Sequence, residues 1–166
     1  MDGAASPFLY VGPCRELILA LKYRARLSLV PFLAGRMAEA AAIRRAGAEP
    51  ADWVVPVPLH AARLRERGFN QAERLARGIS GRLRLPCRDD LLVRCRPTRP
   101  QADLTKAERI RNVRGAFDLS PDPDLRGKRI LLVDDVMTTG STVSACAALL
   151  KSAGAEKVFA LTAARD

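Results

Sequence analysis

Two adjacent carboxylates and a group of hydroxyls stand side by side in the last third of this 166-residue chain. Asp134 and Asp135 follow four apolar residues, and the loop after them contains Thr138, Thr139, Gly140, Ser141 and Thr142. Hydroxyl donors beside a glycine that tolerates positive φ suit a phosphate group. Paired acids beside an anion site suit a diol, or a divalent cation shared with a polyphosphate. The combination predicts a sugar phosphate as the ligand.

The residues on either side of this loop predict how it is positioned. Ile130 to Val133 is apolar without alternation, which indicates a strand buried on both faces of a parallel sheet. Val143 to Ala153 predicts a helix that Gly154 terminates. The loop would then lie at a carboxyl end of the sheet and at a helix N-terminus, where unpaired N–H groups and the helix dipole favour a phosphate.

Other interpretations of this segment fit less well. In the simplest alternative, Asp135 ends a strand, Ser141 or Thr142 caps a helix, and nothing binds. A cap needs one short polar residue, whereas this segment contains two acids, four hydroxyls and a glycine. The chain has no Gly-x4-Gly-Lys-Ser/Thr or Gly-x-Gly-x-x-Gly pattern. Too few residues follow the acid pair for a phosphorylation receiver domain.

Residues 130–142 closely resemble the phosphoribosyl pyrophosphate (PRPP) binding motif of type I phosphoribosyltransferases. The resemblance implies that Asp134 and Asp135 form the catalytic pair, holding the ribose 2- and 3-hydroxyls with Mg²⁺ close by on the substrate. Thr138 occupies the position where the purine-salvage branch has an aspartate base, so the chain is more similar to branches whose nucleophile needs no strong base there. The PRPP-binding residues implied are Val136, Met137, Thr138, Thr139, Gly140, Ser141 and Thr142, and those from Thr138 onward surround the 5-phosphate.

A second resemblance covers the chain from about Tyr10 to its C-terminus. The matching positions are WVVPVPLH at 53–60, RLRERGFNQAE at 63–73, RPT at 96–98, the helix with Leu21-Lys22-Tyr23, and the single residues Gln101, Leu104, Arg109, Asn112 and Phe117. On these blocks the chain is identified as a member of the ComF family of competence-associated proteins. That family is linked to the handling of DNA taken up in natural transformation, and its members resemble phosphoribosyltransferases with an unidentified acceptor.

The resemblance also assigns two further segments. One is a pyrophosphate loop with nearby basic residues, comprising Pro58, Leu59, His60, Arg63 and Arg67. His60 is the one histidine of the chain, and we expect it to form hydrogen bonds in this loop rather than to act as a base. The other is a flexible catalytic loop from Gln101 to Asn112 that closes over the substrate and includes Arg109.

Mg²⁺, bound with PRPP, is the cofactor that the resemblance implies. Many ComF relatives begin with a four-cysteine zinc module. Here the four cysteines are scattered without a Cys-x2-Cys pair, so no zinc is expected in this chain.

The fold class expected is α/β and type I phosphoribosyltransferase-like, a mainly parallel sheet flanked by helices. Residues 1–50 are predicted to form a small helical hood and residues 51–166 the core. Asn70 with Glu73, and Thr105 with Glu108, have the spacing of capping boxes at helix starts. The remaining elements predicted are helices at 13–23 and 31–45 and strands at 53–57, 90–96 and 158–162.

The net charge of +10 gathers in one part of the chain. Residues 60–115 contain 15 Arg or Lys and 6 Asp or Glu. This basic segment suits PRPP, or single-stranded DNA, or it is a solvated face without a partner. Aromatic residues make up 5% of the chain, which argues against a binder that works by base stacking alone.

No signal peptide or membrane-spanning run is visible, so we expect no membrane insertion and a cytoplasmic location. Two functions stay open. One is a phosphoribosyltransferase that displaces pyrophosphate from PRPP with an unidentified acceptor. The other is a non-catalytic PRPP sensor or single-stranded DNA-binding competence factor, with DNA-uptake proteins as partners.

Overall fold

The computed structural model describes residues 1–45, 50–98, 105–121 and 123–166, and its centre is a parallel sheet. The strand order is β1-β7-β6-β3, with β2 also paired to β7. Every pairing in this sheet is parallel, as the apolar run before the acid pair predicts. The strands are β1 (Gly3–Ala5), β2 (Phe8–Leu9), β3 (Trp53–Pro56), β6 (Arg129–Met137) and β7 (Lys157–Arg165).

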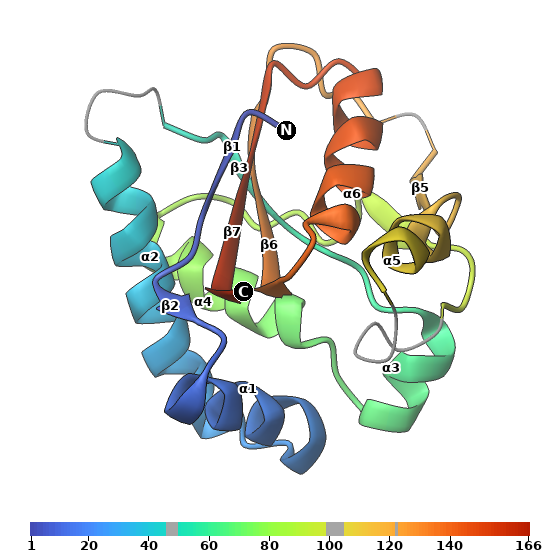
Figure 1. Ribbon diagram of the computed structural model, residues 1–166. Helices are drawn as coiled ribbons and strands as arrows, with labels where there is room; N and C mark the ends of the chain where they lie inside the picture. Colours follow the sequence, from blue (N-terminus) through green and yellow to red (C-terminus); the bar gives the residue numbers. More distant parts are fainter. Residues whose placement is uncertain (46–49, 99–104, 122) are drawn as a thin grey trace.

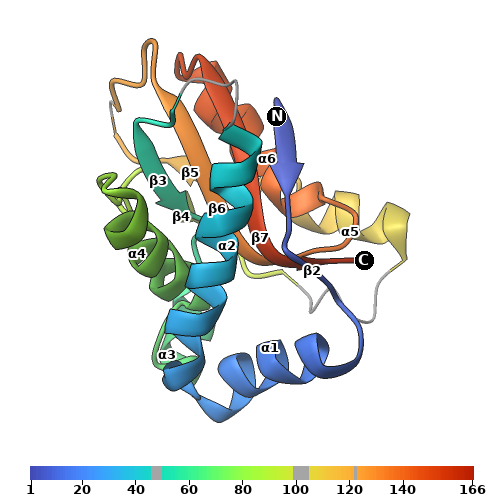
Figure 2. The same ribbon diagram turned by 90° about the vertical axis from the view of Figure 1, so that its left-hand side faces the viewer.

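Helices cover both faces of the sheet and one of its ends (Figures 1 and 2). On one face lie α2 (Val30–Arg45) and α4 (Gln71–Leu83), and on the other lies α6 (Ser141–Ser152), with α5 (Lys106–Val113) packed against it. Beyond the carboxyl ends of the strands lie α1 (Gly12–Arg24) and α3 (Ala61–Arg67), below the arrowheads of β6 and β7. A short 3-10 turn, η1 (Leu27–Leu29), joins α1 to α2.

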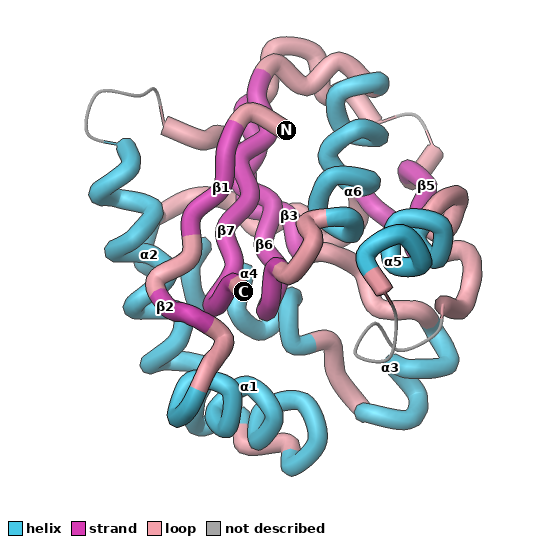
Figure 3. Tube along the Cα trace, in the orientation of Figure 1, coloured by secondary structure: helices cyan, strands magenta, loops and turns pink. Residues whose placement is uncertain are grey.

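The small antiparallel pair of β4 (Leu92–Arg94) and β5 (Phe117–Leu119) lies outside the main sheet, as the magenta segments of Figure 3 show. Its residues contribute to the core on the α6 side. The chain between the two strands carries α5. This pair therefore attaches the predicted catalytic-loop region to the same face as α6.

Two hydrophobic cores meet at β6, which explains its unbroken apolar run. Ile130 and Leu132 belong to the core on the α6 side, and Leu131 and Val133 belong to the core under α2 and α4. Successive residues of a strand point to opposite faces, so a strand covered on both sides needs apolar residues at every position. Full burial of each such side chain contributes roughly 1.5–3 kcal/mol.

Most predicted elements are present with shifted ends. The two predicted N-terminal helices correspond to α1 and α2, each starting one residue earlier than expected. β6 runs on to Met137, so Val136 and Met137 lie in the strand rather than in a loop. β4 is shorter than the strand predicted at 90–96, and β7 is longer than the one predicted at 158–162. β1, β2 and β5 were not predicted. The division at residue 50 stays a prediction, and β1 and β2, which precede it, pair with β7.

Of the two predicted capping boxes, one is confirmed and one is wrong. Thr105 and Glu108 form the full reciprocal box at the start of α5. Asn70 does cap α4, accepting a hydrogen bond from the N–H of Ala72. Glu73, however, pairs with Arg77 one turn further along rather than reaching back to Asn70. An exposed guanidinium at i+4 offers the carboxylate an ion pair in place of the cap.

Candidate functional site

The acid pair lies at the carboxyl end of β6, and its two side chains point to opposite faces of the sheet. On the α6 side, Asp134 is within electrostatic reach of Cys146 and Arg94. On the other side, Asp135 faces Lys22 of α1, with Tyr10 nearby. Both carboxylates are buried, with 9% of Asp134 and 4% of Asp135 exposed. The sheet therefore places one acid in each of two different environments.

Asp134 is held in a form that resists ionisation. Burial, and then the charge of Asp135, raise the pKa of Asp134 to about 7. One of its oxygens, Oδ1, accepts a hydrogen bond of 2.8 Å from the backbone N–H of Asp135. A carboxyl group that binds a proton near neutral pH is poised to respond when a cation or hydroxyl donor arrives, because either partner favours its ionised form.

Asp135 is paired with a lysine from α1, a contact that sequence reasoning missed. Lys22 Nζ lies 2.9 Å from Asp135 Oδ1. Burial acts to lower the pKa of Lys22, but the charge of Asp135 and the hydrogen bond to it reverse the effect, so the pKa is raised overall. The match of Leu21-Lys22-Tyr23 to the ComF family could have indicated that Lys22 has a function. Nothing in the sequence, however, connects residue 22 to residue 135.

The hydroxyl-rich loop forms the start of α6 as predicted, but its cap differs from the simple alternative. The N-cap residue is Gly140, at φ 72°, and no side chain caps the helix. The interpretation in which Ser141 or Thr142 serves as the cap is therefore wrong. Thr139 Oγ1 lies 3.0 Å from Ser141 Oγ, which bends the loop over the helix start. The helix N-terminus faces the loop as an anion site requires.

A shallow hollow of about 10 Å³ lies between Asp134 and this helix start. The structure thus brings together one acid and most of the residues that the family resemblance assigned to PRPP, whereas Thr139 is not among the lining residues. The residues that line the hollow are Asp134, Val136, Met137, Thr138, Gly140, Ser141, Thr142 and Val143.

The predicted pyrophosphate loop begins beside the acid pair. The N–H of Val57 donates to the carbonyl of Val133 at 2.8 Å, so Pro58 and Leu59 leave the sheet next to Asp134. Asn70 Nδ2 donates to the carbonyl of Val57 at 3.0 Å, fixing this exit from the strand. The conspicuous Asn70 of the RGFNQAE block is thereby explained, because one side chain caps α4 and anchors the loop.

The other residues assigned to this loop are engaged in local contacts. His60 Nδ1 accepts the N–H of Ala62 at 3.2 Å and caps α3, in agreement with the hydrogen-bonding role predicted for it. Arg63 pairs with Glu66 at 2.8 Å. Arg67 donates to Gln71 and lies 5.4 Å over the ring of Tyr23. Gly68, at φ 81°, ends α3 and separates it from α4.

The catalytic-loop prediction falls partly outside the residues that the structure describes. Gln101 is one of the residues it leaves undescribed. Arg109 and Asn112 lie on α5, which packs against α6. Arg96 closes the end of this helix by donating to the carbonyl of Arg114 at 2.7 Å and to that of Asn112 at 3.2 Å.

Arg94, on β4, is a further site residue that sequence reasoning missed. Its guanidinium lies 5.1 Å over the ring of Phe117 and donates to Thr98 Oγ1. Burial lowers its pKa, and the charges of Asp134 and Arg63 act on it from nearby. The positive charge of Arg94 thus lies on the Asp134 side, with that of Arg63 near enough to act on it, and a polyanion would gain from both.

Metal-binding capacity rests on the acid pair. Across the described residues, no three of His, Cys, Asp or Glu gather in a way that could hold a metal ion. Asp134 and Asp135 supply the hard oxygen ligands that Mg²⁺ prefers, and one of these oxygens, Asp135 Oδ2, accepts no hydrogen bond from any described residue. The donor set fits Mg²⁺ held by one or two carboxylates together with substrate oxygens.

Comparison with known proteins agrees with this geometry. The phosphoribosyl transferase domain model matches residues 64–166. The chain belongs to the phosphoribosyl transferase domain family. The matched region includes the acid pair, the hydroxyl-rich loop and α6, so the family assignment covers the candidate site itself.

Curated relatives of this phosphoribosyl transferase domain confirm the resemblance to ComF. Competence protein F of Haemophilus influenzae is 36% identical over 106 residues, which cover 63% of this chain and 46% of that protein. DNA utilization protein YhgH of Escherichia coli K12 is 35% identical over 151 residues, covering 90% of this chain and 66% of that protein. The chain thus spans about half to two thirds of the length of these relatives.

Solved structures confirm the fold. The glutamine PRPP amidotransferase of B. subtilis, complexed with ADP and GMP, aligns with a TM-score of 0.52 at 23% identity, over 81% of this chain and 26% of that one. This phosphoribosyl transferase domain therefore has the type I phosphoribosyltransferase-like fold, a parallel sheet flanked by helices. None of the helices in the described part of the chain has the length and apolar character to cross a membrane.

Proposed function

We propose that this chain binds PRPP together with Mg²⁺ and transfers its phosphoribosyl group to an acceptor that is still to be identified. The observation that carries the proposal is the buried acid pair at the end of β6, placed directly before a helix N-terminus whose N-cap residue is Gly140. The acids suit a ribose diol and the helix start suits the 5-phosphate. Since its relatives are named for competence and for DNA utilization, we extend the proposal to a role in the use of DNA.

In this proposal the residues mainly position the substrate. The loop from Thr138 to Thr142 holds the 5-phosphate, so its binding energy orients the reacting carbon. Asp134 and Asp135 accept the ribose hydroxyls. When bound, Mg²⁺ neutralises charge on the pyrophosphate, and these two acids would hold it mostly through the substrate. Arg94 and Arg63 offer further positive charge on the Asp134 side.

The reaction proposed is a displacement at the anomeric carbon. The bond from this carbon to pyrophosphate breaks, the leaving group keeps the electron pair, and the acceptor nucleophile bonds to the carbon and loses its proton to solvent or to the leaving group. Thr138 offers no carboxylate base at the loop start, so the acceptor must need little help in deprotonation. The cytoplasmic location stays a prediction.

A second candidate is a PRPP sensor or single-stranded DNA-binding factor without turnover, which the basic segment favours. Several of its arginines are already engaged, however. Arg77 pairs with Glu73 and Asp89, and Arg88 pairs with Asp90. Such exposed pairs are weak and can open for phosphates, so DNA binding is compatible with them but is not supported by an unpaired basic face.

Calorimetric titration with PRPP, with and without Mg²⁺, tests the proposal. Wild type should bind with Mg²⁺ assistance, and Asp134→Asn combined with Asp135→Asn should lose binding. Asp2→Asn combined with Asp52→Asn is the matched control, because it removes two carboxylates from the opposite end of the sheet. Pyrophosphate release with a panel of acceptors then separates the transferase from the sensor. Folded wild type that fails to bind PRPP would contradict both.

A further inference from the structure

Both carboxylate oxygens of Asp135 are inaccessible, although the proposed function requires this carboxylate to bind a ribose diol. Lys22 occupies Oδ1 at 2.9 Å, and Oδ2 is buried without a hydrogen bond from any residue in the described ranges. The Asp135 side chain is 6% exposed and that of Lys22 is 19% exposed. Neither oxygen of Asp135 is therefore open to a ribose hydroxyl in this conformation.

The residue that blocks Asp135, Lys22, lies on α1, and few residues of this helix are buried. Ile18 and Leu21 are its buried residues, and the helix begins at Val11 without a side-chain cap. It ends at Ala25 in the left-handed region, at φ 48°, which is unfavourable for a residue with a side chain. A helix of 13 residues is marginal by itself and depends on tertiary contacts. The ion pair between Lys22 and Asp135 is its buried polar contact with β6.

We propose that α1 is a lid over Asp135, the second acid of the proposed sugar-phosphate site, and that the ion pair of Lys22 with Asp135 is the latch that keeps this lid closed. The proposal rests on the PRPP binding proposed above, because the ribose hydroxyls must replace the ammonium at Asp135. Lys22 and the ligand then compete for one carboxylate. By linkage, the latch weakens ligand binding and the ligand loosens α1 by the same factor.

Replacing the latch lysine tests the competition. Lys22→Met keeps most of the side-chain length but removes the charge, and we expect PRPP with Mg²⁺ to bind at least about fivefold more tightly than to wild type, the lower end of typical coupling between sites. Lys22→Arg keeps a cation and should stay close to wild type. A fall in affinity in Lys22→Met would overturn the proposal, since Lys22 would then help to hold the ligand.

The matched control is Lys151→Met. Lys151 Nζ lies 3.0 Å from Asp2 Oδ2, so this change removes a lysine from a similar ion pair at the opposite end of the sheet. It should leave PRPP affinity unchanged. A similar gain in affinity in Lys151→Met would show that the effect follows from general loss of positive charge, and it would also overturn the latch.

Hydrogen exchange of the α1 amides gives a measurement that does not require PRPP to bind. In ligand-free protein, exchange should be at least about tenfold faster in Lys22→Met and in Asp135→Asn than in wild type, while the β6 amides stay protected. Unchanged α1 exchange in both variants contradicts the latch even if PRPP binds. A different outcome is that α1 exchanges faster in both variants but neither they nor wild type bind PRPP. That outcome contradicts the proposed function, while the contact between α1 and β6 stands.

Discussion

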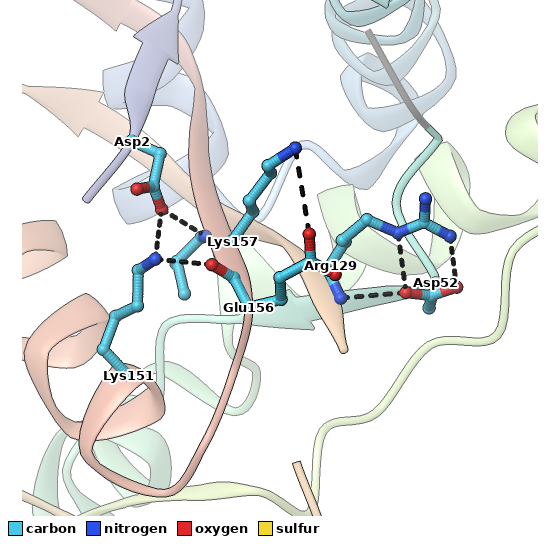
Figure 4. A network of polar contacts seen from close by, with 7 residues as sticks. Asp2, Asp52, Arg129, Lys151, Glu156 and Lys157 are labelled. Carbon is cyan, nitrogen blue, oxygen red and sulfur yellow. Dashed lines mark hydrogen bonds and ion pairs between the residues drawn. The ribbon is translucent and has the colours of Figure 1, made fainter. Parts of the chain in front are cut away.

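At the amino ends of the strands, Asp2 and Asp52 are partly exposed and paired with basic residues, whereas at the carboxyl end of β6 Asp134 and Asp135 are buried. Asp52 accepts the N–H and Nε of Arg129 at 2.8 and 3.1 Å and its Nη2 at 3.0 Å. Asp2 accepts the N–H of Val158 at 2.7 Å and pairs with Lys151 (Figure 4). One sheet thus has carboxylates in two contrasting settings.

The contrast separates Asp52, whose charge stabilises the fold, from Asp134, whose charge the fold disfavours. The bonds from Arg129 lower the pKa of Asp52 to about 2, so its charge is stabilised by folding. Burial raises the pKa of Asp134, so folding disfavours its charge. Groups whose ionisation the fold disfavours occur often at functional sites, where a ligand supplies the missing partner.

The largest expected effect is at Asp134. Asp134→Asn should weaken PRPP binding about 10- to 100-fold, since a hydrogen bond to a charged group contributes about 1.5–3 kcal/mol. It should also raise the free energy of unfolding at pH 8 by about 1–3 kcal/mol. The raised pKa means that wild type gains stability from this group below pH 3.8 and loses it as the pH rises through about 7. Titration calorimetry and urea unfolding at several pH values measure the two effects.

Asp52→Asn should give the opposite result, with unchanged PRPP affinity and a loss of about 1–2 kcal/mol of stability at pH 7. Because the folded pKa of Asp52 is lowered, its contribution is present above pH 3.8 and is lost as the pH falls through about 2. The difference between variant and wild type should therefore shrink on acidification. A difference that stays constant down to pH 2 would disprove this assignment.

Two glycines at positive φ, one at each end of the sheet, allow the two ends to be compared by matched substitutions. Gly140 has φ 72° at the start of α6, and Gly127 has φ 68° in the turn before β6. An added Cβ is sterically accommodated at both, so Gly140→Ala and Gly127→Ala should each cost about 1 kcal/mol of stability through backbone strain. PRPP affinity should fall several-fold in Gly140→Ala and stay unchanged in Gly127→Ala. Equal affinities would mean that the loop geometry does not matter for binding.

The smallest expected effect is at Asp2. Asp2→Asn should cost less than Asp52→Asn, about 0.5 kcal/mol, because the side chain is 40% exposed and solvent weakens its pairing with Lys151. PRPP binding should be unaffected. Thermal unfolding of the two variants in parallel tests the order, and a larger loss for Asp2→Asn would show that exposure is a poor guide to stability here.

Local patterns in the sequence were enough to predict the central unit of the fold. The apolar run before Asp134, the hydroxyl-rich loop and Gly154 predicted β6 and α6 because each depends on neighbouring residues. β1 and β2 escaped prediction because they are three and two residues long, and β1 consists of Gly and Ala, which are poor strand formers. Their strand conformation comes from pairing with β7.

The residues of the site likewise divide into those that local sequence patterns predicted and those that depend on long-range contacts. The loop from Thr138 to Thr142 was predicted as one continuous segment, and most of it lines the hollow. Lys22 and Arg94 were missed because their roles depend on Asp135 and Asp134, which lie at least 40 residues away and come close only after folding. Burial and long-range pairing, which set the chemistry of the acid pair, are properties of the tertiary structure.

The strand order β1-β7-β6-β3 also has a consequence for how the chain is made. Gly3 pairs with Phe159 and Phe8 with Ala164, so the first strands have no partner until nearly all of the described chain has left the ribosome. Even β6 lacks one neighbour until β7 follows. Pairings so distant along the chain close slowly, and exposed strand edges meanwhile invite aggregation. Translation speed and chaperone supply, rather than final stability, are therefore expected to govern the yield of this protein.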